Sequence, residues 1–156
     1  MRNAPRNTIR LRIATAMAAS LLAIGTANAQ APGAKAGLLA ACPERNNCVN
    51  SDGGDPRHAI APLRLKVSPT EAWSELTRVI EATPDARIVQ ATSDYLSAEF
   101  TTGRLRFTDD VEFLLRPQQK EIAVRSASRF GYYDFGVNRE RIEALRAKLR
   151  EKGVVE

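Results

Sequence analysis

Cysteine and histidine are scarce in this chain: its 156 residues include two cysteines and one histidine. A structural zinc site usually takes about four such side chains, and serine hydrolases place a histidine beside the serine. The single histidine, His58, lies far along the chain from Ser126 and Ser128, and no glycine-rich phosphate loop, zinc motif or nucleotide fingerprint occurs. We therefore expect no metal and no cofactor.

Long hydrophobic runs are also missing, apart from one near the N-terminus. Residues 13–25 carry no charge, and the residues before them include Arg2, Arg6, Arg10 and Arg12. Ala27-Asn28-Ala29 then offers the small side chains that signal peptidase accepts. Because a run this short falls below the roughly 20 residues that span a bilayer, residues 1–29 are predicted to be a cleavable signal peptide. We expect export to the periplasm or cell envelope, with no transmembrane segment after cleavage.

A second motif leaves an alternative open. Residues 39–42, Leu-Ala-Ala-Cys, have the form of a lipoprotein cleavage box, which would leave Cys42 lipid-anchored. Such a box should directly end the apolar run, whereas Pro32, Gly33 and Lys35 intervene here. Lipid anchoring is therefore the minor alternative, and residues 30–41 are interpreted as an Ala/Gly/Pro linker.

The positive net charge of the chain, +5, belongs to its N-terminal region. Residues 1–29 contain four arginines and no acid, so their removal leaves 19 Lys and Arg against 18 Asp and Glu. A nearly balanced surface does not attract polyanions over long range. We expect no nucleic acid among the partners of the mature protein.

Cys42 and Cys48, the two cysteines, are expected to form a disulfide. Exported proteins retain such bonds, and residues 43–47 between them include Pro and Asn, which turn easily. The alternatives are metal binding and redox chemistry. A metal would need ligands beyond His58, and the spacing differs from the Cys-x-x-Cys of redox proteins.

One α+β domain is predicted over residues 42–152. It begins with an Asn/Asp/Gly/Ser/Pro-rich loop over residues 42–62, which the disulfide would tie to itself. Residues 63–67 alternate apolar and polar side chains, as a half-buried strand does.

A helix follows that strand. Ser68 as N-cap, Pro69 at N1 and Glu71 at N3 fit a capping box, and Thr83-Pro84 ends the helix. Its apolar face is predicted to consist of Ala72, Trp73, Leu76, Val79 and Ile80.

Strands are predicted over residues 87–92, 95–101, 104–108, 110–116 and 121–128. With Ser93-Asp94 as a turn, Val89 and Ala91 lie opposite Ala98 and Leu96. With Gln118-Gln119 as a turn, Leu115 faces Ile122, Phe113 faces Val124, Val111 faces Ser126 and Glu112 faces Arg125.

A last helix is predicted over residues 139–152, with Asn138 as N-cap and Gly153 beyond its end. Val137 and Ile142 suit a hydrophobic staple, and Ile142, Leu145 and Leu149 form the apolar stripe. We expect an α+β fold of order β-α-β-β-β-β-α in which an antiparallel sheet curls around the C-terminal helix. Helix-grip and TATA-binding-protein-like architectures have this form, and the form alone indicates no function.

Charged residues gather on the last predicted hairpin and the helix after it. Glu112 lies opposite Arg125, and Asp110 lies diagonal to Arg129. The Gly/Tyr/Phe-rich residues 131–136 lead into Arg139 and Arg141, which oppose the helix dipole and so call for a nearby acid. The candidate ligand-binding residues are Arg125, Ser126, Ser128, Arg129, Asn138, Arg139 and Arg141, with Asp109, Asp110, Glu112 and Asp134 as supporting acids.

Three interpretations of this cluster stay open. The acids and arginines form an internal ion-pair network, or they line a pocket for an anion or polar ligand at a helix N-terminus. The third interpretation is catalysis by paired carboxylates, although nearby arginines would keep Asp109, Asp110 and Glu112 ionised.

Four blocks of residues resemble the family known as domain of unknown function 1499, found in bacteria and in plastid-containing lineages. They are Cys42-Pro43 with Asn47-Cys48-Val49-x-Ser51, residues 109–113 (Asp-Asp-Val-Glu-Phe), residues 125–129 (Arg-Ser-Ala-Ser-Arg) with Gly131, and Asp134-x-Gly136-Val137-Asn138-Arg139-x-Arg141-Ile142-Glu143. The family often has two serines where this chain has Asn50-Ser51. The resemblance covers residues 42–150 and implies a shared fold, but no activity, substrate or catalytic residue.

The sequence therefore leaves the function open. Our first hypothesis is a non-enzymatic binding module for a small anionic ligand or the acidic group of a partner. The alternatives are a structural or assembly factor of the cell envelope and a hydrolase that uses the Asp109, Asp110 and Glu112 cluster.

Overall fold

The computed structural model describes residues 34–35, 37–102 and 107–156. The predicted signal peptide lies outside the described residues, as does most of the strand expected at residues 104–108. The disulfide between Cys42 and Cys48 is present, with Cα atoms 5.7 Å apart, so that prediction is confirmed.

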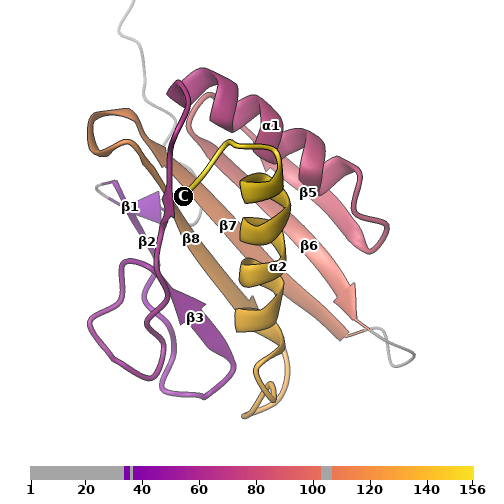
Figure 1. The fold of residues 1–156 in the computed structure, drawn as a ribbon. Coiled ribbons are helices and arrows are strands. Elements are labelled where there is room, and N and C mark those ends of the chain that lie inside the picture. The colour runs from indigo at the N-terminus through magenta and orange to yellow at the C-terminus, as the bar shows by residue number, and fades with distance from the viewer. Residues whose placement is uncertain (1–33, 36, 103–106) are drawn as a thin grey trace, which may run out of the picture.

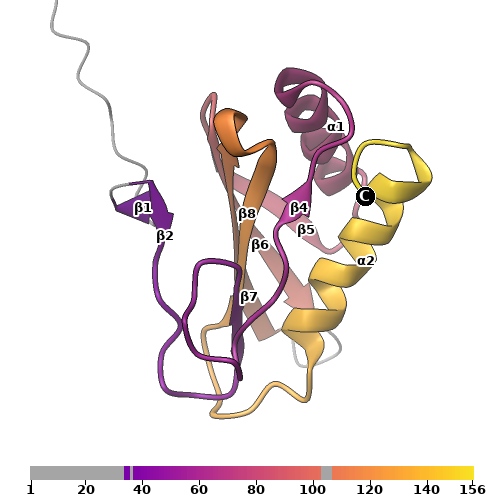
Figure 2. The same ribbon diagram turned by 60° about the vertical axis from the view of Figure 1, so that its left-hand side comes forward.

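The core of the fold is a six-stranded antiparallel sheet with two helices on one face (Figures 1 and 2). Its strand order is β3-β8-β7-β6-β5, and β4 also pairs with β8. The strands are β3 (Cys48–Asn50), β4 (Leu63–Arg64), β5 (Ala86–Ala91), β6 (Tyr95–Thr102), β7 (Phe107–Arg116) and β8 (Glu121–Ser128), and the helices are α1 (Pro69–Glu81) and α2 (Val137–Glu151). The α+β class is confirmed, whereas the likeness to helix-grip architectures stays a prediction.

Helix α1 begins and packs as its sequence predicts. Ser68 is the N-cap, and its hydroxyl oxygen accepts a hydrogen bond from the Glu71 amide at 3.3 Å. The buried face carries Ala72, Leu76, Val79 and Ile80, while Trp73 is only partly buried at the edge of the core.

The β7–β8 hairpin has the predicted register. Leu115 pairs with Ile122, Phe113 with Val124, Val111 with Ser126 and Glu112 with Arg125. A 3-10 turn over Pro117–Gln119 closes it, with Lys120 in the left-handed region at φ 50°. Strand β7 runs unbroken from Phe107 to Arg116, so residues 110–116 form a strand as predicted, but the expected break at residue 109 was wrong.

The β5–β6 hairpin departs from prediction at one residue. Ala91 does pair with Leu96, but Ala98 pairs with Ile88 rather than with Val89. A register shift between Ile88 and Gln90 leaves Val89 as an extra residue, 53% exposed. This is a β-bulge, which alternation alone does not reveal because it moves the pattern by one position.

Helix α2 starts earlier than expected. Its N-cap is Gly136, at φ 88°, and Asn138 lies inside the first turn, so the prediction of Asn138 as N-cap was wrong. A left-handed backbone at the cap suits glycine, and the capping oxygen comes instead from Asp134. The apolar stripe of Ile142, Leu145 and Leu149 is buried as predicted.

Both ends of the described chain reach further into the fold than the predicted boundaries. Within the expected linker, β1 (Ala34–Lys35) and β2 (Leu38–Leu39) form a short hairpin. Leu39 is buried with Tyr95, Leu114 and Ala123, on the sheet face away from the helices. At the other end Val154 and Val155, which follow the predicted boundary at residue 152, belong to the main core.

Candidate functional site

The pleat of the sheet divides the predicted charged cluster into two groups. Asp109 and Ser126 alternate with Asp110 and Arg125 along β7 and β8, so they point to opposite faces. One group faces the helices: Asp109, Ser126 and Ser128, which meet Asn138 and Arg141 of α2. The other faces away from the helices: Asp110, Glu112 and Arg125, with Arg129 just after β8.

On the face away from the helices, arginines and acids bond to one another. Arg129 forms three hydrogen bonds to the Asp110 carboxylate, the shortest 2.7 Å, and one to Glu99 at 2.6 Å. Glu99 also accepts from Arg87 at 2.6 Å. Hydrogen bonds donated by the two guanidiniums lower the pKa of Glu99, and the hydrogen bonds that Arg129 donates to Asp110 and Glu99 raise the pKa of Arg129.

Beside this group lies a more buried one around Glu112. Its carboxylate accepts hydrogen bonds from Arg125 and from the Tyr95 hydroxyl, both at 2.7 Å. Burial, followed by the hydrogen bond to Glu112, raises the pKa of Tyr95. The predicted pairing of Glu112 with Arg125 is therefore an ion pair that also holds a buried tyrosine.

On the helix face, the side chain of Asn138 is the centre of a buried network. Its amide nitrogen donates to the Asn47 carbonyl at 3.0 Å, the Ser128 hydroxyl at 2.9 Å and Asp134 at 2.9 Å. Its oxygen accepts from Ser126 at 2.6 Å and Arg141 at 2.8 Å. Asn138 and Ser126 have no exposed surface, so α2 is bonded to β8, to the residue before β3 and to the loop before the helix.

Arg141 completes this network with a buried charge. Its guanidinium donates to the Asp109 carboxylate and to the Ser126 hydroxyl, and it lies 5.2 Å from the centre of the Phe100 ring. Asp109 is 2% exposed and Arg141 9%. A buried pair of opposite charges is strongly coupled, because either charge alone would be left without solvent or partner.

Asp134 caps α2 from two residues before the N-cap. One carboxylate oxygen accepts from the Gly136 amide at 3.0 Å, and the other accepts from the Asn138 amide at 3.1 Å. Burial acts to raise the pKa of Asp134, but the hydrogen bonds from Gly136 and Asn138 outweigh it and lower that pKa. The acid required near the N-terminus of α2 is therefore Asp134, and it is held in its charged form.

These contacts distinguish among the predicted residues. Arg125, Arg129 and Arg141 each bond to a carboxylate, and the three candidate catalytic acids lie on two faces of the sheet. Arg139 differs, because its guanidinium donates to the Ala59 carbonyl at 2.8 Å and, within the part of the chain that the structure describes, to no carboxylate.

Arg139 lines a pocket of about 360 Å³ between the N-terminus of α2 and the disulfide-tied segment, called the basic pocket below. Two further basic side chains, Arg57 and His58, lie in its wall. Arg57 is paired with Asp55, and hydrogen bonds from Arg57 lower the pKa of Asp55 to about 2. The lining consists of Asn46, Cys48, Val49, Arg57, His58, Tyr133, Asp134, Gly136 and Arg139.

His58 is the unusual member of this lining. It is 3% exposed, and its Nδ1 lies 2.8 Å from the Cys48 carbonyl oxygen, which can only accept. Nδ1 therefore carries hydrogen, and Nε2 is buried without a hydrogen-bond partner, 3.9 Å from the nearest Asp55 oxygen. Asn47 Oδ1 and Arg125 Nε are also buried without a partner among the described residues, but of the three only His58 Nε2 belongs to a residue that lines this pocket, where a ligand could supply its partner.

The disulfide helps to place this wall of the pocket. It links Cys42 to Cys48 at the start of β3, which pairs with β8. Inside the loop that the disulfide closes, two residues bond to the loop before α2. The Asn46 carbonyl accepts from the Asp134 amide at 3.2 Å, and the Asn47 side chain donates to the Gly131 carbonyl at 2.8 Å. By stabilising residues 42–48, the disulfide therefore also helps to hold the loop at residues 131–134 in place.

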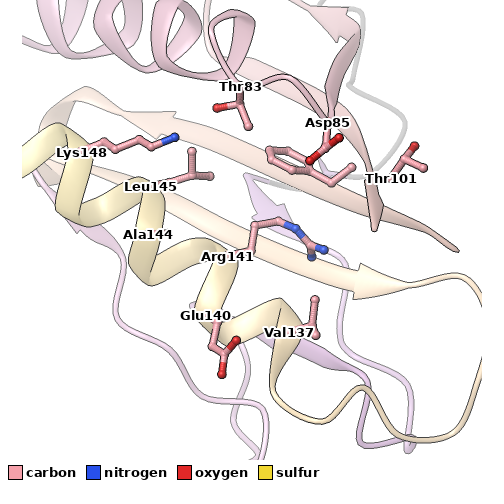
Figure 3. Close-up of a pocket in the computed structure, with 10 residues that line it drawn as sticks. Thr83, Asp85, Thr101, Val137, Glu140, Arg141, Ala144, Leu145 and Lys148 are labelled. Atoms are coloured by element: carbon pink, nitrogen blue, oxygen red, sulfur yellow. The ribbon is translucent and has the colours of Figure 1, made fainter. Parts of the chain in front are cut away.

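A second pocket of about 380 Å³ lies between α2 and the ends of α1 and β6 (Figure 3). Its charged lining mixes both signs, with Asp85 and Glu140 against Arg141 and Lys148. None of the side chains that line it has a buried polar atom without a partner among the described residues, in contrast to His58. We therefore regard the basic pocket as the better candidate site.

The described ranges also hold neither a metal-ligand cluster nor a membrane-spanning helix. No group of three His, Cys, Asp or Glu side chains there could hold a metal ion. No helix in those ranges is both long and apolar enough to cross a membrane.

Sequence reasoning missed Arg57, Asn47 and Tyr133 as site residues. Arg57 and Arg139 are 82 positions apart in the numbering, and only the pairing of β3 with β8 brings them to one pocket. Asn47 did carry a signal, because it lies in the block Asn47-Cys48-Val49 that resembles the family pattern.

Comparison with known proteins gives a family and no activity. No curated protein and no solved structure matches this chain. A family model described as a protein of unknown function, DUF1499, matches residues 38–149 and so spans the sheet, both helices and the basic pocket. The resemblance in the sequence blocks is confirmed, and the chain belongs to the DUF1499 family.

Proposed function

We propose that this protein is a non-enzymatic binding module that takes a small anionic ligand, or the acidic group of a partner, in the basic pocket. The observation that carries this proposal is the buried Nε2 of His58 without a partner, in a wall shared with Arg139. When protonated, Nε2 would donate a hydrogen bond to an anion, and the Arg139 guanidinium offers further donors.

The charge balance of the pocket supports an anion rather than a cation. Arg139 has no carboxylate partner among the described residues, and Asp134 is the one carboxylate of the described lining against Arg57, His58 and Arg139. The hydrolase alternative has less support, because Asp109, Asp110 and Glu112 do not converge and each bonds a guanidinium.

We also propose that the protein acts outside the cytoplasm, in the periplasm or cell envelope. The support is the signal-peptide pattern of residues 1–29 together with the Cys42–Cys48 disulfide, which is typical of oxidising compartments. Mass spectrometry of the chain from an envelope fraction tests this, since cleavage after Ala29 gives a defined mass. An intact N-terminus would contradict it. A lipid-modified Cys42 would keep the envelope location but exclude cleavage after Ala29 and the Cys42–Cys48 disulfide.

The binding proposal is tested by titrating the envelope-purified chain with inorganic phosphate and with acetate, and following amide shifts by NMR. Arg139→Gln should weaken binding about tenfold or more, since hydrogen bonds to a charged group are worth about 1.5–3 kcal/mol. Arg150→Gln is the matched control: it removes an equal charge from an exposed residue of α2 outside the pocket.

One variant tests the role of His58. In His58→Asn, the side-chain amide nitrogen takes the place of Nδ1 and can still donate to the Cys48 carbonyl, whereas Nε2 is removed. It should keep the fold and lose anion affinity. Equal anion affinity in the wild type, Arg139→Gln and His58→Asn would contradict the proposal. The charged residues of this region would then serve only as structural ion pairs.

A further inference from the structure

Five exposed aromatic side chains lie around the loop between β8 and α2, which is at the lower end of the molecule in Figure 1. Each is more than half exposed: Phe107 51%, Phe130 71%, Tyr132 68%, Tyr133 58% and Phe135 85%. The whole chain has nine aromatic residues, so most of them lie outside the core. Apolar surface gathered in one exposed place marks a binding site more often than chance.

Four of these rings line a pocket of about 380 Å³, called the aromatic pocket below. Tyr133 and Phe135 meet edge to face, with ring centres 5.2 Å apart and planes at 78°, and so form a corner. The lining is Phe107, Asp109, Ser128, Phe130, Gly131, Tyr133, Asp134, Phe135 and Val137.

Among the described residues, Asp109 and Asp134 are the carboxylates that line this pocket, and no Lys, Arg or His of those residues lines it. The described lining is therefore acidic. Asp109 is balanced by Arg141, but Asp134 bonds only to amide groups among the described residues. Ring faces beside a carboxylate suit a cation whose charge is spread over alkyl groups, because such a cation loses little hydration on contact with them.

Phe135 gives independent support for a role in binding. Its backbone lies in the left-handed region, at φ 55°, which is uncommon for a bulky side chain. Its ring adds almost nothing to the core, since 85% of its surface is exposed. Neither backbone preference nor burial explains a phenylalanine here, whereas contact with a ligand does.

The aromatic pocket adjoins the basic pocket, since Tyr133 and Asp134 line both. We infer that the aromatic pocket binds an alkylated ammonium group, and that the ligand of the two pockets together is a zwitterion of the phosphocholine type. The anionic half of this inference rests on the proposed function, while the ammonium half rests on the aromatic pocket alone.

The test uses three soluble probes on the envelope-purified chain, with dissociation constants from NMR titration. Choline probes the aromatic pocket, inorganic phosphate the basic pocket, and phosphocholine both. Phosphocholine should bind at least tenfold more tightly than choline or phosphate. Sedimentation with vesicles then distinguishes a lipid headgroup from the free compound. Sedimentation with phosphatidylcholine vesicles but not with phosphatidylglycerol vesicles indicates the lipid headgroup, and sedimentation with neither indicates the free compound.

Variants assign each half of the ligand. Phe135→Leu should weaken the binding of choline and phosphocholine about five- to tenfold and leave phosphate binding unchanged. Arg139→Gln should weaken the binding of phosphate and phosphocholine and leave choline binding unchanged. Tyr132→Leu is the matched control, because Tyr132 is an exposed neighbour that lines neither pocket. Tyr133→Leu repeats the test at the second ring of the corner.

The outcomes separate the two proposals. Phosphate binding without choline binding would overturn the ammonium inference and leave the proposed function standing. Choline binding without phosphate binding would overturn the proposed function and the zwitterion, and retain an ammonium site. Choline affinity that is equal in the wild type, Phe135→Leu and Tyr133→Leu would also overturn the aromatic assignment.

Discussion

Asn138 bonds to Asp134 twice: its backbone amide and its side-chain amide both donate to the same carboxylate oxygen, at 3.1 and 2.9 Å. The first bond caps the helix, and the second ties that cap to the buried network on β8. The loop that carries Tyr133 and Phe135 is therefore held at its end by the same residue that anchors α2 to the sheet.

Removing this anchor should be among the most damaging single changes. Asn138→Ala deletes five side-chain hydrogen bonds in a fully buried position. Since each buried group left without a partner costs about 1–3 kcal/mol, we expect a loss of roughly 3–5 kcal/mol in urea unfolding. The exposed Gln118→Ala serves as control, and a loss below about 1 kcal/mol for Asn138→Ala would contradict this account.

The buried pair of Asp109 and Arg141 should show the asymmetry expected of charges without water. Asp109→Asn leaves the Arg141 guanidinium buried beside a neutral group and should cost about 3–5 kcal/mol. Asp109→Leu combined with Arg141→Met should recover most of that loss, because it removes both charges. Unfolding of the single and double variants measures the difference, and equal losses in both would rule out a charge effect.

Asp134 should make stability depend on acid pH. Its pKa is lower in the folded than in the unfolded chain, so the stabilisation is present above about pH 4 and is lost as the pH falls through the folded value. Asp134→Asn should cost roughly 1 kcal/mol near pH 6, as expected for a lost helix cap. The gap between wild type and variant should close towards pH 2, whereas a gap that is constant with pH would exclude the carboxylate charge as its cause.

Phe135 should be dispensable for folding. Phe135→Asn places a residue that tolerates the left-handed region at φ 55°, and little apolar burial is lost. We expect thermal unfolding to show stability unchanged or raised by up to about 1 kcal/mol. Phe113→Ala, at a fully buried ring, should instead lose about 3–5 kcal/mol. Similar losses for the two variants would mean that the exposed ring supports the fold.

Local sequence patterns predicted the elements whose signals lie close together in the chain. Ser68 and Glu71 marked the start of α1, and the alternation of β7 and β8 about one turn set their register. The bulge at Val89 was not predicted, because one inserted residue leaves the composition of the strand unchanged. Strand β3 was not predicted, because its three residues are all buried and show no alternation of apolar and polar side chains.

The candidate site was predictable only in part, because it depends on contacts between distant segments. Arg139 was identified from its place near a helix N-terminus, and it does line the basic pocket. Arg125, Ser126 and Ser128 seemed equivalent to it in the sequence, but the pleat and the carboxylates of β7 place them elsewhere. Arg57 and His58 lie in a loop whose position follows from the pairing of β3 with β8.

The C-terminal residues carry a consequence for how the chain reaches its native state. Val154 and Val155 are buried. The Lys66 amide donates to the Val154 carbonyl at 2.9 Å and the Glu156 amide donates to the Arg64 carbonyl at 3.0 Å, so this end of the chain is bonded to the segment just before α1. During synthesis, the hydrophobic layer between the helices and the sheet stays incomplete until these two valines have left the ribosome. Removing residues 154–156 should therefore leave the domain in a loosely packed form.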